Sequence, residues 1–329
     1  MRKKMKIDFV VTWVDGSDPK WLRKKNKYSP SDEIMNTDIR YRDYGTFKYW
    51  FRAIEENAPW VNKVYLVTEG HYPEWLNLNN EKLCLVKHSD FMSERYLPTF
   101  NSNAIELNVH KIKGLSEHFV LFNDDVFLMN KTSPGDFFRK GLPRDFAIYN
   151  PTIPSTDFSN ILFNDVRIIN KHFNKMEDIK NNFFKVFNIF YGAKILRNIV
   201  TLPWPKILGY WNSHLTSSFL KSTFEEVWDK EKDILEETSR NKFRTPNDVN
   251  QWLMRYFQIE EGHFEPQNSN FGKIYTLNQF DELKTVMNND KYKVLCINDD
   301  FDVQNYEQKM EELINMFEKA FPNKSSYEI

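Results

Sequence analysis

The stretch Ile7-Asp-Phe-Val-Val-Thr-Trp-Val-Asp-Gly-Ser-Asp-Pro19 decides the fold prediction. Its first six residues are apolar or β-branched apart from one acid, a pattern typical of a buried strand. The part from Asp15 to Pro19 is rich in turn-forming residues. A buried strand that ends in a polar turn is typical of α/β proteins, which bind ligands at the carboxyl ends of their strands. We therefore expect residues 15–18 to lie at a binding site.

Further strands and helices alternate along the chain on either side of this stretch. Strands are predicted at residues 63–68, 83–86, 119–122, 273–275 and 294–297. Helices are predicted at residues 44–57, 102–113, 246–258 and 303–320, where apolar residues recur at helical spacing. This alternation predicts an α/β fold with a largely parallel sheet and helices on both faces.

The composition excludes several classes of protein. A hydrophobic fraction of 41% over 329 residues argues against disorder, and a net charge of −1 gives no overall field that would attract nucleic acid. Cys84 and Cys296 both lie in apolar runs, so we expect free thiols in a reducing compartment. The sequence has no apolar stretch of the length that a signal peptide or a membrane span requires. The expected location is the cytoplasm.

Two similar acidic motifs follow predicted strands. Asn123-Asp-Asp125 comes after Phe119-Val-Leu-Phe122, and Asn298-Asp-Asp300 comes after Val294-Leu-Cys-Ile297. Carboxylates at the end of a buried strand are costly unless a cation compensates them. A divalent metal that holds a diphosphate would do so, because hard cations bind carboxylate and phosphate oxygens. The alternative is ordinary turn chemistry, in which Asn and Asp are common.

A base and a phosphate-binding group are harder to select. Histidine suits proton transfer near neutral pH, but the spacing of the seven histidines does not single one out. The histidines considered are His71, His88, His110 and His214. Arginine matches two phosphate oxygens at once, and the arginines in exposed-looking loops are Arg40, Arg42 and Arg244. The alternative for each arginine is a plain surface charge.

The middle of the chain is basic and aromatic. Residues 179–224 contain no Asp or Glu, while Lys and Arg recur among many Phe, Trp and Ile residues. One interpretation is a surface for a membrane or an anionic acceptor. The other is a helical insertion whose aromatic side chains pack on the core, and this second interpretation is favoured. The expected division is an α/β core at 1–150, a helical insertion at 151–235, and a return to the core at 236–329.

Four blocks of the sequence resemble the conserved blocks of the Stealth family of sugar-phosphate transferases. The first is residues 7–19, and the second runs from Arg40-Tyr-Arg-Asp43 to Phe122-Asn-Asp-Asp125. The third combines Asn212-Ser-His214 with residues 243–250, and the fourth is Cys296-Ile-Asn-Asp-Asp300. The blocks occur in the family's order and span nearly the whole chain.

The resemblance implies a Rossmann-like core of glycosyltransferase-A type. It also implies transfer of a hexose 1-phosphate from a UDP-sugar, with UDP-N-acetylhexosamine expected, to a glycan hydroxyl of capsule or exopolysaccharide. UMP would be released, and Mg²⁺ or Mn²⁺ would assist. The partners would be the UDP-sugar donor and a glycan acceptor, with a peripheral contact to the membrane or to the polysaccharide-assembly machinery. The alternatives are a glycosyltransferase that releases UDP and a non-catalytic glycan-binding module.

The resemblance also implies roles for individual residues. The UDP-sugar would contact Asp8, Trp13, Asp15, Gly16, Asp18, Arg40, Arg42 and Asn101. The metal would be held by Asp124, Asp125 and Asp299. The catalytic residues would be His214, Arg244, Asp125 and Asp299. Asp300 is left out because the fourth block of the animal N-acetylglucosamine phosphotransferase looks more like Asn-Asp-Asn.

Overall fold

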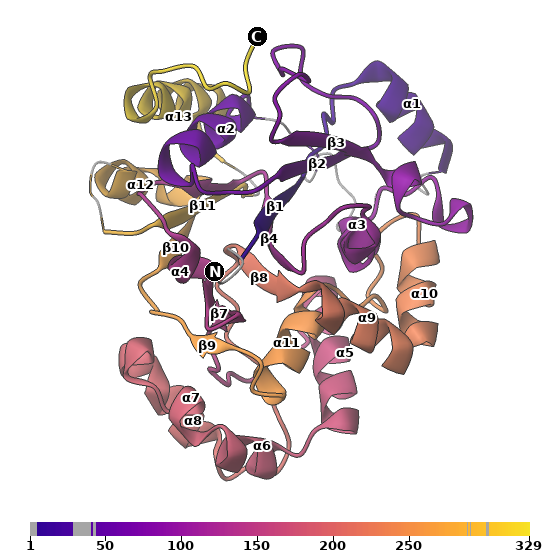
Figure 1. The fold of residues 1–329 in the computed structure, drawn as a ribbon, viewed down its shortest axis with the longest axis vertical. Coiled ribbons are helices and arrows are strands. Elements are labelled where there is room, and N and C mark those ends of the chain that lie inside the picture. The colour runs from indigo at the N-terminus through magenta and orange to yellow at the C-terminus, as the bar shows by residue number, and fades with distance from the viewer. Residues whose placement is uncertain (1–4, 29–40, 42–43, 288, 290, 301–302) are drawn as a thin grey trace.

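A computed structural model describes residues 5–28, 41, 44–287, 289, 291–300 and 303–329. Its central sheet has the strand order β3-β2-β1-β4-β8 (Figure 1). The strands are β1 (Ile7–Thr12), β2 (Val64–Thr68), β3 (Leu83–Lys87), β4 (His118–Asn123) and β8 (Ser217–Leu220). The first four are parallel, and β8 runs antiparallel to β4. The predicted α/β class with a largely parallel sheet is confirmed.

The chain changes direction across the sheet at β1. From β1 it passes to β2 and β3 on one side, and β4 then pairs with β1 on the other side. The carboxyl ends of β1 and β4 therefore flank the switch point of the sheet, which is the usual ligand position in open α/β folds. Thr12 of β1 is in register with Asn123 of β4, so the first turn and the first acidic motif leave the sheet side by side.

A second sheet brings the two acidic motifs together. Its order is β10-β11-β5, with β10 (Gly272–Thr276), β11 (Val294–Asn298) and β5 (Val126–Leu128). β5 starts directly after Asp124 and Asp125, so these residues connect the two sheets. β11 is antiparallel to β5, and the backbone N–H of Ile297 donates to the carbonyl of Asp125 over 2.9 Å. The end of β11, where Asn298 begins the second motif, thus lies beside the first motif.

Helices surround both sheets. The helices nearest the central sheet and the second sheet are α1 (Pro19–Tyr28), α2 (Phe47–Asn57), α3 (Ser102–Asn108), α9 (Lys221–Lys230), α10 (Lys232–Arg240), α11 (Trp252–Glu260), α12 (Phe280–Met287) and α13 (Tyr306–Ala320). The C-terminal helix α13 closes the second sheet: Phe317 stacks on Tyr49 of α2 at 5.5 Å and contacts Phe127 of β5 at 4.5 Å. Apolar burial of this kind is the main stabilising force.

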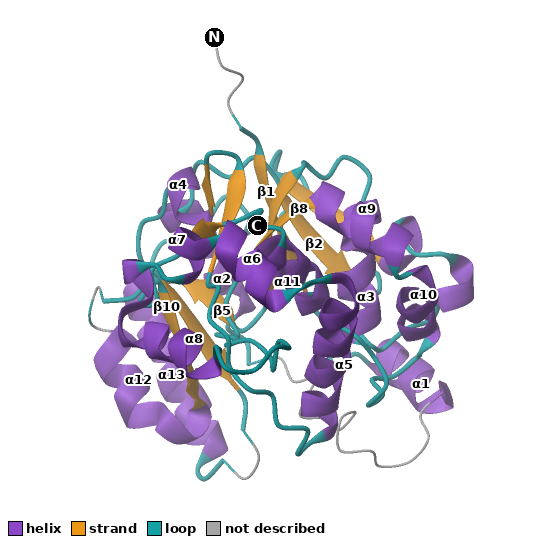
Figure 2. Ribbon diagram, turned by 90° about the horizontal axis from the view of Figure 1, so that it is seen from below, coloured by secondary structure: helices purple, strands orange, loops and turns teal. Residues whose placement is uncertain are grey.

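A third group of elements begins with short strands and a helix that pack against the central sheet, where Phe137 contacts Phe9 of β1, and continues outward as helices. It comprises α4 (Pro134–Phe137), β6 (Phe138–Arg139), β7 (Leu142–Asp145), β9 (Glu265–Pro266), α5 (Asp157–His172), α6 (Lys175–Asn181), α7 (Phe183–Val186) and α8 (Ile195–Thr201). Helices α6, α7 and α8 form the lower edge of the view in Figure 1 and lie toward the viewer in Figure 2. Residues 151–235 also contain β8 and α9, which pair with or pack beside the central sheet. Among the described residues, no helix combines the length and the apolar character that crossing a bilayer requires.

Candidate active site

One cleft of about 610 Å³ opens at the carboxyl ends of the strands. It is lined by the end of β1 at Thr12, the end of β4 at Asn123 and the end of β11 at Asn298. β8 also contributes, because its antiparallel direction brings its first residue, Ser217, to the same edge. A cleft of this volume is in the range that binds small molecules and cofactors.

Asp125 lies at the junction of the two sheets, in the wall of this cleft. Its Oδ2 accepts a hydrogen bond from the Cys296 thiol at 3.4 Å and lies 4.0 Å from His214 Nε2. Its Oδ1 is buried and has no hydrogen-bond partner among the described residues. Burial raises the pKa of the Asp125 carboxyl, and the positive charge that His214 can carry opposes this shift. A buried acceptor without a donor is costly and is the kind of atom that a cation would satisfy.

Asp124 and Asp299 line the same cleft and extend this group of carboxylate oxygens. Tyr44 also lines the cleft, and burial, followed by the nearby Asp299 and Asp125 carboxylates, raises the pKa of its hydroxyl. Acids from both motifs line this one cleft, so the motifs face a common space. Among the described residues, the group of three side chains whose ligand atoms lie within metal-binding reach of one another is Asp125, His214 and Cys296, and Asp124 and Asp299 stand outside it.

Cys296 and His214 lie close enough to Asp125 to suggest a softer metal. One ligand atom from each of the three residues falls within a span of 4.8 Å. The pKa of the Cys296 thiol, however, is raised well above its ordinary value by burial and by Asp125, and the thiol donates a hydrogen bond to that carboxylate. A metal bound there would displace the thiol proton, since a coordinating thiol is deprotonated. The group therefore offers one oxygen, one nitrogen and one sulfur atom to a divalent cation.

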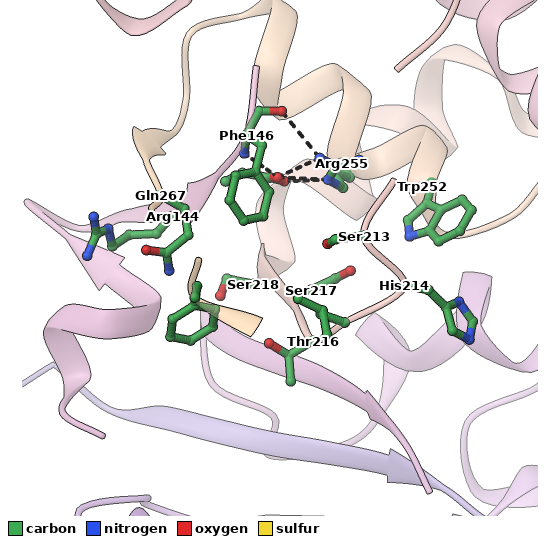
Figure 3. A pocket seen from close by; sticks show the side chains of 13 residues that line it. Arg144, Phe146, Ser213, His214, Thr216, Ser217, Ser218, Trp252, Arg255 and Gln267 are labelled. Atoms are coloured by element: carbon green, nitrogen blue, oxygen red, sulfur yellow. Dashed lines mark hydrogen bonds and ion pairs between the residues drawn. The ribbon is translucent and has the colours of Figure 1, made fainter. Parts of the chain in front are cut away.

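His214 lies in the loop before β8, with its ring edge-on to Trp252 at a centroid distance of 6.2 Å. Its φ of 46° lies in the left-handed region, which is uncommon for a residue other than Gly. About a third of the side chain is exposed. In Figure 3, His214 stands near Trp252 and apart from Arg255. His214, Leu215, Ser217 and Trp252 also line the smaller pocket drawn in Figure 3, which adjoins the cleft.

A buried polar network fixes the loop that carries His214. Arg255 Nη1 donates to Asn212 Oδ1 at 2.6 Å, and the Tyr256 hydroxyl bonds the same amide. Arg255 is itself buried against Asp145, with Nε 2.7 Å from Oδ2 and Nη2 2.7 Å from Oδ1. A bidentate pair of this kind has fixed geometry. Since Asn212 is two residues before His214, the network holds the backbone on which the histidine depends.

Arg244 also lines the cleft. Its Nη2 donates to the Ser102 hydroxyl at 2.5 Å, at the start of α3. One turn further along α3, Glu106 also lines the cleft, and burial raises its pKa to about 7, while the nearby Arg244 opposes the shift. Sequence reasoning missed Glu106. The signal available was an acid on a helix that is otherwise buried.

The first sequence block, residues 7–19, divides into a part that lines the cleft, Thr12 to Val14, and a supporting turn. Trp13 lines the cleft, stacks on Phe47 at 5.4 Å, and has a buried Nε1 that has no acceptor among the described residues. Asp15, Gly16 and Asp18 do not line the cleft. The Asp15 carboxylate accepts from the Ser17 backbone and hydroxyl. Asp18 caps α1 through the backbone N–H of Trp21 at 2.6 Å, a hydrogen bond that lowers the pKa of Asp18.

Gly16 is required by close packing. A Cβ on Gly16 would lie 2.0 Å from the carbonyl oxygen of Tyr41, a contact that no larger residue could make. Tyr41 is itself a cleft residue. The glycine therefore positions one wall of the cleft against another.

Two predicted donor-binding residues are not brought to the cleft. Asp8 is fully buried near the opposite end of β1, where it accepts from Asn62 Nδ2 at 2.6 Å and from the Ser116 backbone at 2.7 Å. Asn101 is buried at the N-cap of α3 and donates to Asp248 at 2.8 Å. Both side chains are used in holding loops together, and contact of Asp8 and Asn101 with a nucleotide sugar stays a prediction. Arg40 and Arg42 lie outside the described residues.

Comparison with solved structures finds glycosyltransferases at low similarity. A galactosyltransferase, LgtC, in complex with donor and acceptor sugar analogues is 9% identical with a TM-score of 0.40, covering 97% of this chain and 98% of that chain. The bifunctional glycosyltransferase WbbM is 10% identical with a TM-score of 0.42, covering 98% of this chain and 51% of that chain.

Comparison of sequences gives a much stronger relationship. Residues 5–33 match the family model of Stealth protein conserved region 1, and residues 40–145 match that of conserved region 2. A capsular polysaccharide phosphotransferase, WcwK, of Streptococcus pneumoniae is 46% identical over 100% of this chain and 99% of its own length. The receptor polysaccharide phosphotransferase WefC of Streptococcus oralis is 46% identical, covering 98% of this chain and 99% of that protein. The exopolysaccharide phosphotransferase cps2G of Lactiplantibacillus plantarum is 44% identical, covering 98% and 96%.

The similarity to these relatives extends over the full length of the chain, so it includes the parts that form the cleft. The resemblance found in the sequence blocks is therefore confirmed, and the chain belongs to the Stealth family of sugar-phosphate transferases.

Proposed function

We propose that the protein transfers a hexose 1-phosphate from a UDP-sugar, a UDP-N-acetylhexosamine by expectation, to a hydroxyl of a capsular or exopolysaccharide glycan. UMP is the other product. The observation that carries this proposal is the gathering of Asp125, His214 and Arg244 in one cleft from three distant parts of the sequence. Transfer of a phosphorylated sugar requires a carboxylate to hold a metal ion, a base for the acceptor hydroxyl, and a positively charged side chain for the phosphate.

The bond changes follow from the products. The acceptor oxygen forms a bond to the β-phosphorus of the UDP-sugar, and the bond from that phosphorus to the bridging oxygen breaks. The bridging oxygen leaves with UMP. The bond between the sugar C1 and its oxygen is not broken, so the anomeric configuration is retained.

His214 takes the proton of the acceptor hydroxyl as that oxygen attacks. The Asp125 carboxylate, 4.0 Å from His214 Nε2, stabilises the imidazolium that results. The buried network through Asn212 and Arg255 holds the histidine in place. Positioning of this kind lowers the barrier because the base does not have to be ordered during the reaction.

Arg244 stabilises the negative charge on the phosphoryl group during transfer, through its guanidinium donors. A Mg²⁺ or Mn²⁺ ion held by Asp124, Asp125 and Asp299 would neutralise charge on the diphosphate and on the departing UMP. Trp13 also lines the cleft, and its Nε1, which has no acceptor among the described residues, is a candidate donor to the nucleotide sugar.

The site of action is the cytoplasmic side of the membrane, where UDP-sugars are available. The free state of Cys84 and Cys296 supports a reducing compartment.

Nucleotide product analysis tests the proposal. The purified protein is incubated with a panel of UDP-sugars, an acceptor glycan and Mg²⁺ or Mn²⁺, and the nucleotides are separated. UMP formed in step with a phosphodiester-linked product supports the proposal. Release of UDP would indicate glycosyl transfer instead, and binding without turnover would indicate a glycan-binding module.

A further inference from the structure

Helices α6, α7 and α8 and the turns around them expose an unusual number of large apolar side chains. Phe184 is 83% exposed and Ile189 is 84% exposed. The apolar-basic face, as we name it, comprises the exposed apolar residues Phe183, Phe184, Ile189, Leu196, Ile199, Val200 and Trp204 together with the exposed basic residues Lys180, Arg197 and Lys206. The interpretation that these aromatic residues pack on the core is wrong for the residues of this face.

The side of the segment opposite this face is already attached to the rest of the protein. Asn198 is fully buried, and its side-chain amide bonds Ala147 and Val186 carbonyls and the Tyr149 backbone N–H. Lys185 Nζ donates to the carbonyls of Gly262 and Phe264 at 2.7 and 2.8 Å. Because the inner side has its polar and apolar partners, the outward side chains are not core residues that failed to pack.

The exposed apolar side chains protrude separately from short helices. Phe184 on α7, Leu196 and Val200 on α8, and Trp204 beyond α8 each extend into solvent. The three helices lie together on one side of the molecule in both Figure 1 and Figure 2. Separate apolar tips on one side of a protein are suited to insertion into a soft, non-specific apolar medium.

The charge of the face is positive. No acid occurs between residues 179 and 224, and the nearest exposed acid on α6 is Glu177. Arg197 and Lys206 donate to neutral groups, the Asn150 side chain and the Asn170 carbonyl, so these contacts leave their charges uncompensated. A surface that combines exposed basic residues with exposed Phe and Trp is complementary to an anionic lipid headgroup region above an acyl layer.

We propose that the apolar-basic face docks the protein onto the surface of an anionic phospholipid bilayer. A second copy of this chain is the poorer occupant, because a twofold interface would set the same basic residues against one another. The docking is peripheral. The inference goes beyond the proposed reaction and does not depend on it, since binding to lipid requires no turnover.

The test is flotation of the full chain with vesicles of phosphatidylcholine alone and of phosphatidylcholine mixed with phosphatidylglycerol. We expect the protein to float with the anionic vesicles, to float poorly with the neutral ones, and to be released as salt is raised. The double variant Phe184→Ser with Ile189→Ser should lower the partition coefficient roughly a hundredfold, because two large apolar side chains are lost from the buried interface. The charge variant Arg197→Glu with Lys206→Glu should also abolish binding to anionic vesicles.

The matched control is Tyr72→Ser with Leu78→Ser, which removes two exposed apolar residues (43% and 44% exposed) outside the face. Its binding should equal that of the wild-type chain. Circular dichroism and turnover on a water-soluble acceptor should be unchanged in all variants, so a loss of binding is not a loss of fold or of the reaction. The proposal fails if the wild-type protein does not float with anionic vesicles, or if the Phe184→Ser, Ile189→Ser variant binds as well as the control. It also fails if the wild-type protein sediments as a dimer, the Phe184→Ser, Ile189→Ser variant sediments as a monomer, and the two bind vesicles equally well.

Discussion

Replacing Asp125 by Asn tests whether this carboxylate belongs to a cation site. In the absence of a metal, the charged form of Asp125 is disfavoured by burial, which is why its pKa is raised, and its Oδ1 has no hydrogen-bond partner among the described residues. A neutral Asn has nearly the same shape and does not carry that charge. The Asp125→Asn chain should therefore be at least as stable as the wild type in EDTA at neutral pH.

When Mg²⁺ or Mn²⁺ is added, the wild-type chain should become the more stable of the two. A ligand at about 100 times its dissociation constant stabilises the folded state by about 2.7 kcal/mol. For 329 residues the entropy of unfolding is about 0.7 kcal/mol per kelvin, so the wild-type melting temperature should rise by about 4 °C. Loss of one charged ligand lowers the affinity by about a hundredfold or more, so Asp125→Asn should rise by less than about 1 °C at the same metal concentration.

Thermal melts in EDTA and in a Mn²⁺ titration measure both effects. Asp229→Asn is the matched control, because Asp229 is an exposed acid on α9 that does not line the cleft. It should show the full wild-type response. If the Asp125→Asn chain shows the same Mn²⁺ shift as the wild type, Asp125 is not a metal ligand and the assignment is withdrawn.

Three further variants test the rest of the site and its support. His214→Asn should lower turnover by about 10²–10⁴-fold, because the base is lost. The melting temperature should not change, because Asn tolerates the φ of 46°. Turnover at the wild-type rate would remove His214 from the mechanism. Arg244→Lys keeps the positive charge but loses the planar guanidinium, so kcat should fall about tenfold or more. The melting temperature should stay constant. An unaffected kcat would contradict the role of Arg244. Glu260 is buried, accepts from the hydroxyls of Tyr149 and Tyr210, and has its pKa raised to about 8 by burial. Because the folded pKa is above the ordinary value of 4.5, wild-type stability should fall as pH rises between them, by up to about 1.4 kcal/mol per pH unit. Urea unfolding from pH 5 to pH 8 should show this loss of stability in the wild type, and stability should depend less on pH in Glu260→Gln. The same pH dependence in both chains would refute the raised pKa of Glu260.

Much of the fold could be predicted because its strands carry strong local patterns. The predicted strands at 119–122 and 273–275 correspond to β4 (His118–Asn123) and β10 (Gly272–Thr276). The predicted helix at 246–258 begins only at Trp252 in the structure. The reason is that the Asp248 carboxylate accepts from the Thr245 backbone and hydroxyl, which holds the preceding residues in a turn.

The arrangement of the cleft depends on contacts that no local pattern contains. β5 is three residues long, and only its antiparallel pairing with β11 sets Cys296 beside Asp125. Arg255 lies in a helix whose residues are mostly apolar, and no local pattern indicates that it pairs with Asp145, 110 residues away. Glu106 was similarly hidden in a predicted helix.

Exposure of the apolar-basic face was also beyond the reach of the sequence. A dense run of Phe, Ile and Trp normally predicts burial, because apolar surface is removed from water whenever the fold allows it. Here Tyr191 and Asn198 are buried on the inner side and leave Phe184 and Ile189 outside. Which side of a short helix faces the core is set by its tertiary neighbours.

The identity of the nucleotide released is the most direct test of the proposed reaction. The wild-type protein, a UDP-sugar, an acceptor glycan and Mn²⁺ should yield UMP and a phosphodiester-linked sugar in equal amounts, and His214→Asn should suppress both together. UDP as the stoichiometric product, with no phosphorus retained on the acceptor, would contradict transfer of a sugar phosphate.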